Sequence, residues 1–218
     1  MLTSMELSRL DGVVDECELL ATTFDSESAD LVLHLSILAN PQSGSDQRPQ
    51  VSLRIESVGR VVALLRDLEH VEHPAGEGFP GFGHPYPTSE PVGPPIPVGD
   101  LVALVEIMNS YQPTLYWLPE KIFDAPEPPG WLDEASLDAQ LSPTAAHSMH
   151  LWVDENPGLG RRDLHLFVTF YEAELQGADG RPCTIDEVAD AVSSWWHRMA
   201  AGDTRGQFGV LPAGPLEG

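Results

Sequence analysis

Three segments of the chain alternate apolar and polar residues one by one, and this alternation constrains the fold more than any other feature of the sequence. The segments are 30–38, 51–56 and 147–153. Successive side chains of a β-strand point to opposite faces, so a period of two is typical of a strand with one buried and one polar face. The chain is therefore expected to build antiparallel sheet, in which one face can meet water.

Two further segments complete the predicted sheet. A mixed apolar pattern over 13–24 indicates a strand. Consecutive strands with short connections usually pair, so we expect it to form a meander with 30–38 and 51–56. Residues 164–175 are apolar on both faces, as in a central strand that is covered on both sides. We expect this strand to form a hairpin with 147–153.

Two helices have recognisable ends. Asp100 can cap a helix that carries an apolar stripe, and Pro113 ends that helix. Thr184 and Glu187 have the spacing of a capping box, in which hydroxyl and carboxylate each satisfy a backbone N–H at the helix start. The buried stripe predicted for this last helix consists of Ile185, Val188, Val192, Trp195 or Trp196, and Met199.

Three other segments have weaker patterns. Apolar residues recur at helical spacing over 58–70, which predicts a helix, although Gly59 and the adjacent valines leave a strand as the alternative. Residues 132–141 have a weak helical pattern. Residues 114–118 are expected to form a short strand.

Residues 74–99 contain eight prolines and six glycines, a composition that neither a packed helix nor a central strand tolerates. We predict a long Pro/Gly-rich loop here, and its Pro-x-x-Pro pattern at 91–97 has acidic flanks that favour a spacer over a docking motif. The predicted fold class is α+β, with antiparallel hairpins and helices packed on the sheet. It forms one domain over 1–200 that the loop interrupts, followed by a disordered tail over 201–218.

The charge of the chain is strongly unbalanced, since 34 Asp and Glu stand against 11 Lys and Arg and give a formal net charge of −23. A negative field repels phosphate backbones and anionic lipid head groups, which disfavours nucleic acids and membrane surfaces as partners. The same field attracts basic protein surfaces. Acidity also serves solubility or adaptation to high salt, and charge alone does not choose between these roles.

The cysteine content and the first residues bear on the compartment. Cys17 and Cys183 are too few for a disulfide scaffold, and reduced thiols are the simpler interpretation. The chain does not begin with a basic region followed by an apolar run, and no apolar stretch reaches the roughly 18 residues of a membrane span. We expect a cytoplasmic protein.

Two His-x-x-His patterns have a spacing found in metal sites. Positions three apart in a strand point to opposite faces, so His147 and His150 cannot both face one ion if 147–153 is a strand. His70 and His73 lie at a predicted helix end, where the helix dipole also favours histidines, and no second ligand pair accompanies them. We therefore predict no metal site and no cofactor.

A cysteine and a pair of glutamates are the candidates for catalysis. Cys183 precedes the last helix, whose dipole can lower a thiol pKa, but a lone cysteine is more often an inert buried side chain. Glu172 and Glu174 share a strand face and could act as acid and base with His165 or His150. Carboxylates on a strand that leaves the core are more often only solvated. We therefore predict no catalytic residue.

Aromatic residues are the remaining candidates for a binding surface. Trp195 and Trp196 are adjacent and cannot both face inward on one helix, so we expect one of them to be exposed. An exposed tryptophan is a frequent anchor of a protein interface. The candidate interface residues are Trp195, Trp196, Trp152, Phe79, Phe82 and Tyr86.

The charge and the lack of a recognised motif favour a non-enzymatic acidic protein that binds and neutralises or chaperones a basic protein, as inhibitors, immunity proteins and antitoxins do. The alternative is an enzyme whose active site lies beneath the 74–99 loop. The sequence contains no nucleophile elbow, phosphate-binding loop, dinucleotide fingerprint or calcium loop that would favour this alternative.

Overall fold

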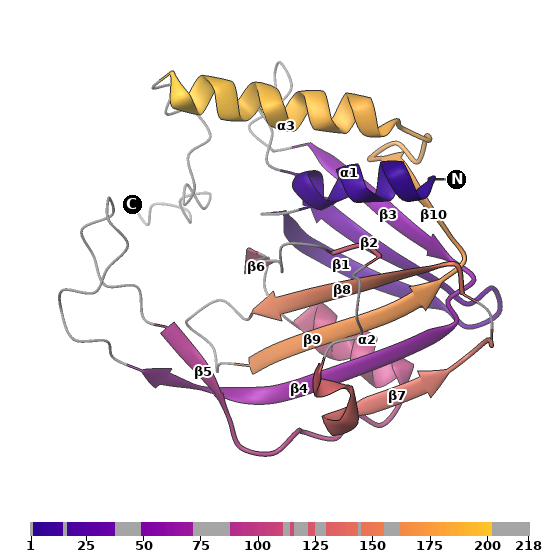
Figure 1. Cartoon of the computed structure of the whole chain (residues 1–218), viewed down its shortest axis with the longest axis vertical. Helices are drawn as coiled ribbons and strands as arrows, with labels where there is room; N and C mark the ends of the chain where they lie inside the picture. The colour runs from indigo at the N-terminus through magenta and orange to yellow at the C-terminus, as the bar shows by residue number, and fades with distance from the viewer. Residues whose placement is uncertain are drawn as a thin grey trace, which may run out of the picture.

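A computed structural model of the chain describes residues 2–14, 17–37, 49–71, 88–110, 114–115, 122–124, 130–143, 145–154 and 162–201. These residues form two antiparallel β-sheets and three α-helices (Figure 1). The fold is therefore α+β, as predicted.

Sheet A has five strands in the order β10-β3-β2-β1-β6. The strands are β1 (Glu18–Asp25), β2 (Asp30–Ser36), β3 (Gln50–Glu56), β6 (Thr114–Leu115) and β10 (Glu172–Gly177). The predicted meander is confirmed, because β1, β2 and β3 are antiparallel neighbours in chain order. β6 is the described part of the strand predicted over 114–118.

Sheet B has the order β5-β4-β9-β8, and β7 pairs with β4 as well. Its strands are β4 (Arg60–Val71), β5 (Thr88–Val92), β7 (Leu137–Gln140), β8 (His147–Asp154) and β9 (Arg162–Phe170). The predicted hairpin of 147–153 with the following strand is confirmed by the antiparallel pairing of β8 and β9.

The two sheets share two long strand runs that change sheet at the same place. β3 leads into β4, and β9 leads into β10. The runs stay paired on both sides of this corner, with Glu56 opposite Glu172 in sheet A and Arg60 opposite Thr169 in sheet B. The side chains that face outward in the two sheets therefore come in large part from the same two runs.

The single strand predicted over 164–175 is wrong. Tyr171 separates β9 from β10, and its backbone N–H donates to the carbonyl of Glu56 at 3.3 Å. The apolar pattern continues through the corner because Phe170 and Ala173, on either side, are both buried in the same core. The pattern therefore gave no sign that the chain changes sheet.

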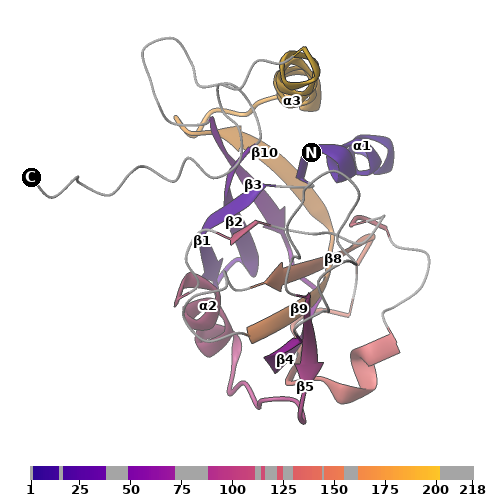
Figure 2. The same cartoon turned by 90° about the vertical axis from the view of Figure 1, so that its left-hand side faces the viewer.

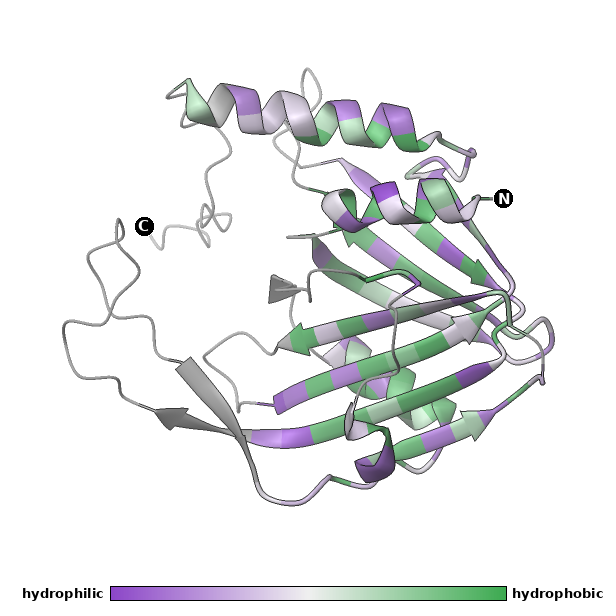
Figure 3. Ribbon diagram, viewed as in Figure 1, coloured by the Kyte–Doolittle hydropathy of each residue, from purple (hydrophilic) through white to green (hydrophobic). Residues whose placement is uncertain are grey.

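Apolar side chains of both sheets meet in one core. Buried and less buried positions alternate along β3 and β10, and the hydropathy colours of Figure 3 follow this alternation. The core cluster joins Leu33 of β2, Leu53 of β3 and Leu166 of β9 with residues of all three helices. Such a shared core is what one domain requires, and the domain boundaries stay a prediction.

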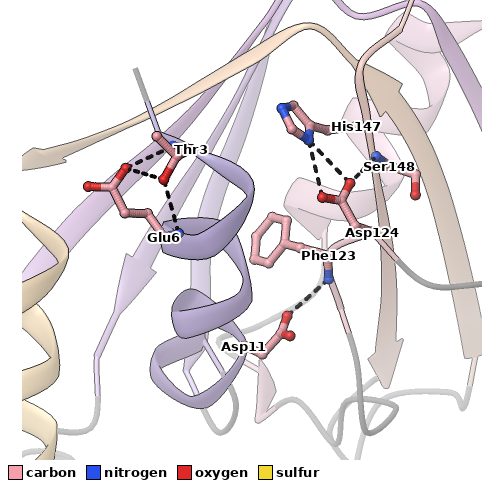
Figure 4. Close-up of polar contacts among 7 residues, drawn as sticks. All are labelled: Thr3, Glu6, Asp11, Phe123, Asp124, His147 and Ser148. Atoms are coloured by element: carbon pink, nitrogen blue, oxygen red, sulfur yellow. Dashed lines mark hydrogen bonds and ion pairs between the residues drawn. The ribbon is translucent and has the colours of Figure 1, made fainter.

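The strand predicted over 13–24 is wrong in its first part, because helix α1 occupies Ser4–Val14 and β1 begins only at Glu18. Thr3 and Glu6 form a capping box at the start of α1 (Figure 4). Glu6 Oε2 accepts from the Thr3 N–H at 2.8 Å, and Thr3 Oγ1 accepts from the Glu6 N–H at 3.3 Å. The hydrogen bonds that this carboxylate accepts from the Thr3 N–H and the Thr3 hydroxyl lower the pKa of Glu6.

Helix α1 connects β10 of sheet A with β8 of sheet B. The Leu2 N–H donates to the carbonyl of Ala173 in β10 at 2.9 Å. Asp11 Oδ1 accepts from the Phe123 N–H at 3.0 Å (Figure 4). Phe123 also forms a β-bridge with Met149 of β8. The helix thus contacts both sheets, directly at β10 and by way of Phe123 at β8.

Helix α2 (Leu101–Ser110) begins at Asp100, as predicted, and Asp100 Oδ1 accepts from the Ala103 N–H at 2.8 Å. It lies next to β1 (Figure 2). Asn109 replaces a strand neighbour there, because its Oδ1 accepts from the Thr22 N–H at 2.7 Å and its Nδ2 donates to the Thr22 carbonyl at 2.8 Å. The side chain thereby satisfies the backbone at the sheet edge.

The helix predicted over 58–70 is wrong, and the alternative of a strand is correct. The segment forms β4, which pairs with β9 on one side and with β5 and β7 on the other. Residues 61–65 are all buried, and all of them are apolar. A continuous apolar run also contains apolar residues at helical spacing, which is why the pattern indicated a helix. Residues 132–141, predicted to be weakly helical, contain the end of a 3-10 helix, η1 (Gly130–Glu134), and β7.

Helix α3 (Ile185–Ala200) begins with the predicted capping box. Glu187 Oε2 accepts from the Thr184 N–H at 2.7 Å, and Thr184 Oγ1 accepts from the Glu187 N–H at 3.3 Å. The helix packs beside α1 (Figures 1 and 2), and Arg9 of α1 pairs with Asp186 of α3. Its buried side chains include Ile185, Val188, Val192 and Trp195.

Part of the predicted 74–99 loop is a strand. β5 pairs with β4 at the edge of sheet B, and Pro91 lies opposite Leu68. Proline is confined to edge strands because it cannot donate a ladder hydrogen bond, so this position agrees with the exclusion of a central strand. The part of the predicted loop before β5 lies outside the described residues, which leave out 72–87. The predicted tail lies outside them from residue 202 onward.

Candidate functional site

The outer face of sheet A is polar and acidic. It is formed by side chains that alternate with core residues along β1, β2, β3 and β10. Asp30, at the start of β2, joins them through a contact with Arg54. We call this surface the acidic face, and its residues are Thr23, Asp30, Val32, His34, Ser52, Arg54, Glu56, Glu172, Glu174 and Gln176.

Arg54 lies among the carboxylates of the acidic face. Its Nη2 lies 2.6 Å from Asp30 Oδ2, its Nε lies 3.3 Å from Glu56 Oε1, and Glu174 is opposite it on β10. Burial alone would raise the pKa of Asp30, but the hydrogen bonds from Arg54 and from the Ser57 N–H outweigh it, so this pKa is lowered. The charge of Arg54 is therefore already matched within the fold.

Glu56 and Glu172 are directly opposite each other in the register of β3 and β10. Like charges at opposed positions destabilise a sheet. The acidic face holds four carboxylates, those of Asp30, Glu56, Glu172 and Glu174, and one guanidinium, so its formal charge is −3. Arg54 pairs with Glu56 at 3.3 Å, whereas Glu172 forms no ion pair with the described residues.

The polar contacts of the acidic face are made within the face. His34 Nδ1 lies 2.9 Å from Ser52 Oγ, and Gln176 Nε2 donates to Glu174 Oε2 at 3.1 Å. In the part of the chain that the structure describes, no helix forms a hydrogen bond or an ion pair with these side chains. Apart from buried Asp30, the side chains of the acidic face are half-buried or exposed.

The outer face of sheet B carries a chain of three polar side chains. Asp163 and His165 lie two positions apart on β9, and His150 projects from the neighbouring β8. His165 Nε2 lies 3.2 Å from Asp163 Oδ2, and His165 Nδ1 lies 3.4 Å from His150 Nε2. Asp163 is only 1% exposed, so its carboxylate depends on these partners rather than on water.

Two tryptophans enclose this chain. Trp152 stacks on His165 with ring centroids 5.9 Å apart and planes inclined by 5°, and its Nε1–H donates to Asp163 Oδ1. Trp131 of η1 contacts both imidazoles, with centroids 5.7 Å from His150 and 5.6 Å from His165. We call Trp131, His150, Trp152, Asp163 and His165 the imidazole–indole cluster.

Arg66 of β4 connects the cluster with the end of η1. It lies opposite Asp163 in the register of β4 and β9, and its Nη2 pairs with Glu134. The Nε1 of Trp131 is buried and has no hydrogen-bond partner among the described residues. η1 is therefore held over the cluster by one ion pair and by ring contacts.

The geometry of the two imidazoles favours a shared proton over a bound metal ion. The ring centroids of His150 and His165 lie 5.6 Å apart and the facing nitrogens 3.4 Å apart, so the nitrogens lie near the line between the centroids. Two ligands in a tetrahedral site would instead point to a common centre beside that line. No group of three His, Cys, Asp or Glu in the described ranges could hold a metal ion.

The protonation of the pair follows from its partners. Burial, assisted by the charge of His165, lowers the pKa of His150 from 6.5 to about 4, so His150 is neutral at pH 7. When Asp163 accepts the Nε2–H of His165, the Nδ1 of neutral His165 is left to accept from His150 Nε2–H. The pair can take up one proton and share it between the facing nitrogens, which is the capability of a general acid or base.

The prediction that His147 and His150 face opposite sides of their strand is confirmed. His147 Nδ1 lies 3.2 Å from Asp124 Oδ2, whereas His150 belongs to the imidazole–indole cluster (Figure 4 shows the first contact). The backbone of His70 lies near the end of β4, a strand rather than the predicted helix. Its side chain and the whole of His73 lie outside the described residues.

Cys183 does not have the lowered pKa of a nucleophile. Burial raises the pKa of its thiol, and the charge of Glu187 raises it further. Cys17 is buried, and its Sγ lies 3.1 Å from the carbonyl of Val13. Neither Cys17 nor Cys183 forms a disulfide, and neither has the environment of a reactive thiolate.

The two glutamates considered as acid or base lie far from the two histidines in the strand order, on a different sheet. Glu172 and Glu174 lie on the acidic face of sheet A, while His150 and His165 lie on the outer face of sheet B. The carboxylate that contacts His165 is that of Asp163 instead. An acid and base pair of Glu172 or Glu174 with these imidazoles is therefore not formed.

The interface role predicted for the aromatic residues stays a prediction, and the structure gives the exposure of two of them. One of the two adjacent tryptophans is exposed, as predicted, since Trp196 is 41% exposed and Trp195 is 2% exposed. Their rings meet edge to face with centroids 4.9 Å apart. Trp152 is held in the imidazole–indole cluster. Three predicted interface residues lie outside the described residues, namely Phe79, Phe82 and Tyr86.

Sequence reasoning did not find Trp131 and Asp163. Asp163 and His165 are two positions apart, which places them on one face of a strand, and this spacing was the available signal. The contact with Trp131 depends on η1 folding back over sheet B, and no local pattern indicates such a contact.

Comparisons of the chain with family models, with curated proteins and with solved structures found no match. No helix within the described ranges is long and apolar enough to cross a membrane. Geometry and charge are therefore the only guides to function.

Proposed function

We propose that the chain is a non-enzymatic, cytoplasmic protein that binds a basic protein through the acidic face and neutralises or chaperones it, as inhibitors, immunity proteins and antitoxins do. The observation that carries this proposal is the opposed pair Glu56 and Glu172 on a polar sheet face that no described helix contacts through a polar group. Cys17 and Cys183, which form no disulfide, support a reducing compartment.

The opposed carboxylates create a place for a cation. A lysine or arginine of a partner that enters between Glu56 and Glu172 would remove their repulsion and form charge-assisted hydrogen bonds with both. Arg54 does not bridge the two, because it pairs with Asp30 at 2.6 Å and with Glu56 at 3.3 Å but forms no ion pair with Glu172. Binding therefore supplies an interaction that the free protein lacks.

The charge of the whole chain acts in the same direction. A net charge of −23 attracts a basic protein from a distance and can raise the association rate by roughly one to three orders of magnitude. Long-range attraction does not fix an orientation, whereas a defined row of carboxylates does. We therefore assign steering to the overall charge and docking to the acidic face.

The test compares two triple variants of equal charge. The face variant carries Glu56→Gln, Glu172→Gln and Glu174→Gln on the acidic face. The control variant carries Glu106→Gln, Asp133→Asn and Asp190→Asn, three exposed positions on α2, η1 and α3. Each removes three negative charges, and thermal melts establish that both variants are folded.

Immobilised wild-type, face-variant and control proteins are exposed to lysate of the source cells at about 0.1 M and about 1 M salt, where the Debye lengths are roughly 10 and 3 Å. We expect one basic protein to be retained by wild type and control at low salt, and to be lost from the face variant and at high salt. Equal retention by the face and control variants would show that net charge alone acts, and would exclude the acidic face as the docking site. Retention that ignores salt would exclude a charge-based interface.

A further inference from the structure

The charges around the two imidazoles of the imidazole–indole cluster limit how many protons the imidazoles can hold. The residues of the cluster are separate from the acidic face, so its behaviour does not depend on the proposed function. Asp163 contacts His165, and the nearest cation is Arg66, which lies opposite Asp163 in the strand register and pairs with Glu134. One cation and two anions give this surround a formal charge of −1.

The other charged residues near the cluster contribute little to this formal charge, or have side chains outside the described residues. Arg162 and Asp67, in the next row of β9 and β4, pair at 3.8 Å and cancel each other. Asp133 of η1 is exposed to solvent. Asp154 is opposite Asp163 in the register of β8 and β9, and its side chain lies outside the described residues.

One added proton on the two imidazoles balances the formal charge of −1 around them, and a second added proton does not. A single proton brings the formal charge of the group to zero and keeps one N–H and one lone pair between His150 and His165. A second proton makes the charge +1 and places two N–H donors head to head at 3.4 Å. The hydrogen bond between the rings is then lost, and two imidazolium charges repel each other in a partly buried site.

Relief requires water, and η1 is the part that can admit it. Trp131 lies over both imidazoles and its Nε1 forms no hydrogen bond with the described residues. The chain just after η1 is fixed, because Ser136 N–H donates to the carbonyl of Ala63 at 2.7 Å. η1 itself is held to sheet B by the pair of Arg66 and Glu134 and by the ring contacts of Trp131.

We propose that a second proton on the His150 and His165 pair releases η1 from the outer face of sheet B and exposes the indole rings of Trp131 and Trp152. The protein thereby carries an acid-triggered aromatic surface, distinct from the acidic face. The low pKa of His150, about 4, places the release well below neutral pH and keeps η1 closed at pH 7.

Heteronuclear NMR of the full-length, ¹⁵N-labelled chain tests this directly. Indole N–H cross-peaks report Trp131 and Trp152, assigned with Trp131→Phe and Trp152→Phe, and the peak of Trp195 reports the core of α3. Long-range ¹H–¹⁵N spectra follow the protonation of each imidazole. The matched variants are His150→Gln, which can still donate to His165 but takes up no proton, and His34→Gln, whose histidine is bonded to Ser52 on sheet A.

As the pH falls from 7.5, we expect the native Trp131 peak to be lost with the same midpoint as the second protonation of the pair, while the Trp195 peak keeps its position. His150→Gln is expected to retain the native Trp131 peak through that pH range, and His34→Gln to behave as wild type. A Trp131 peak that stays native after both imidazoles are protonated overturns the proposal. So does loss of the Trp131 and Trp195 peaks together, or an unchanged transition in His150→Gln.

Discussion

The outer faces of sheet A and sheet B are built by the same strand runs, yet they have opposite surroundings. In sheet A the outward residues of β3 and β10 are carboxylates around Arg54, and no described helix makes a polar contact with them. In sheet B the outward residues of β8 and β9 are imidazoles, an indole and the buried Asp163, and η1 covers them.

The difference shows what strand alternation decides and what it leaves to chemistry. Alternation determines which side chains face outward. Whether another segment then covers the face depends on the side chains that the face carries. A buried carboxylate requires hydrogen-bond donors from the protein, whereas charged groups near solvent can be hydrated by water. In sheet B, η1 covers a face that holds a buried carboxylate, whereas no described helix makes a polar contact with the outward side chains of sheet A.

Asp163→Asn should have the largest effect, because it removes the charge that His165 and Trp152 enclose and that Arg66 faces. We expect the free energy of unfolding to fall by about 2–3 kcal/mol, as for a buried polar group that loses its partners. Urea denaturation measures this change.

Asp138→Asn is the matched control for that substitution. Asp138 binds Arg60 on the surface, with side chains 48% and 35% exposed, so its loss should cost less than about 1 kcal/mol. Equal losses for the two variants would show that the carboxylate of Asp163 has no special place in sheet B.

The pH dependence of stability should come from sheet B and depend on His150. The pKa of His150 is lowered from 6.5, the ordinary value for histidine, to about 4 in the folded protein. As the pH falls below about 6.5 the unfolded chain takes up this proton and the folded chain does not, so the free energy of unfolding declines until the pH nears 4.

His150→Gln should flatten that decline, and urea midpoints at pH 7.5, 6 and 5 measure it. His34→Gln, on sheet A, should leave the slope unchanged. If the two variants have the same slope as wild type, the acid sensitivity lies elsewhere in the chain.

Glu172→Gln should have the smallest effect on stability, and of the opposite sign. It removes the repulsion with Glu56 across β3 and β10, so we expect a gain of about 0.2–1 kcal/mol. Glu106→Gln, an exposed position on α2, is expected to change little. A loss of stability in Glu172→Gln would mean that the two carboxylates are already compensated.

Much of the acidic face could be predicted from the sequence, because local alternation determines the outward residues of a strand. The period of two placed Ser52, Arg54 and Glu56 on one face of β3, and the structure confirms that they share it. The pairing of Glu56 with Glu172 could not be predicted, since the register between strands far apart in the chain is set by tertiary packing.

The imidazole–indole cluster was beyond local patterns for a related reason. His150 and His165 meet because β8 pairs with β9, and a hairpin of these segments was predicted. Trp131 arrives from η1, in a segment whose pattern indicated only a weak helix. Likewise, β4 resembles a helix in sequence because both of its faces are buried over 61–65, which erases the alternation.

Carboxylate footprinting by mass spectrometry is the most direct test of a docking role for the acidic face. A carbodiimide and glycine ethyl ester label exposed carboxylates of the unmodified chain, with and without the basic protein that it captures. We expect labelling of Glu56, Glu172 and Glu174 to fall several-fold on binding, and labelling of the exposed residues Glu106 and Asp190 to stay unchanged. Protection spread evenly over all carboxylates, or confined to residues outside the acidic face, would contradict it.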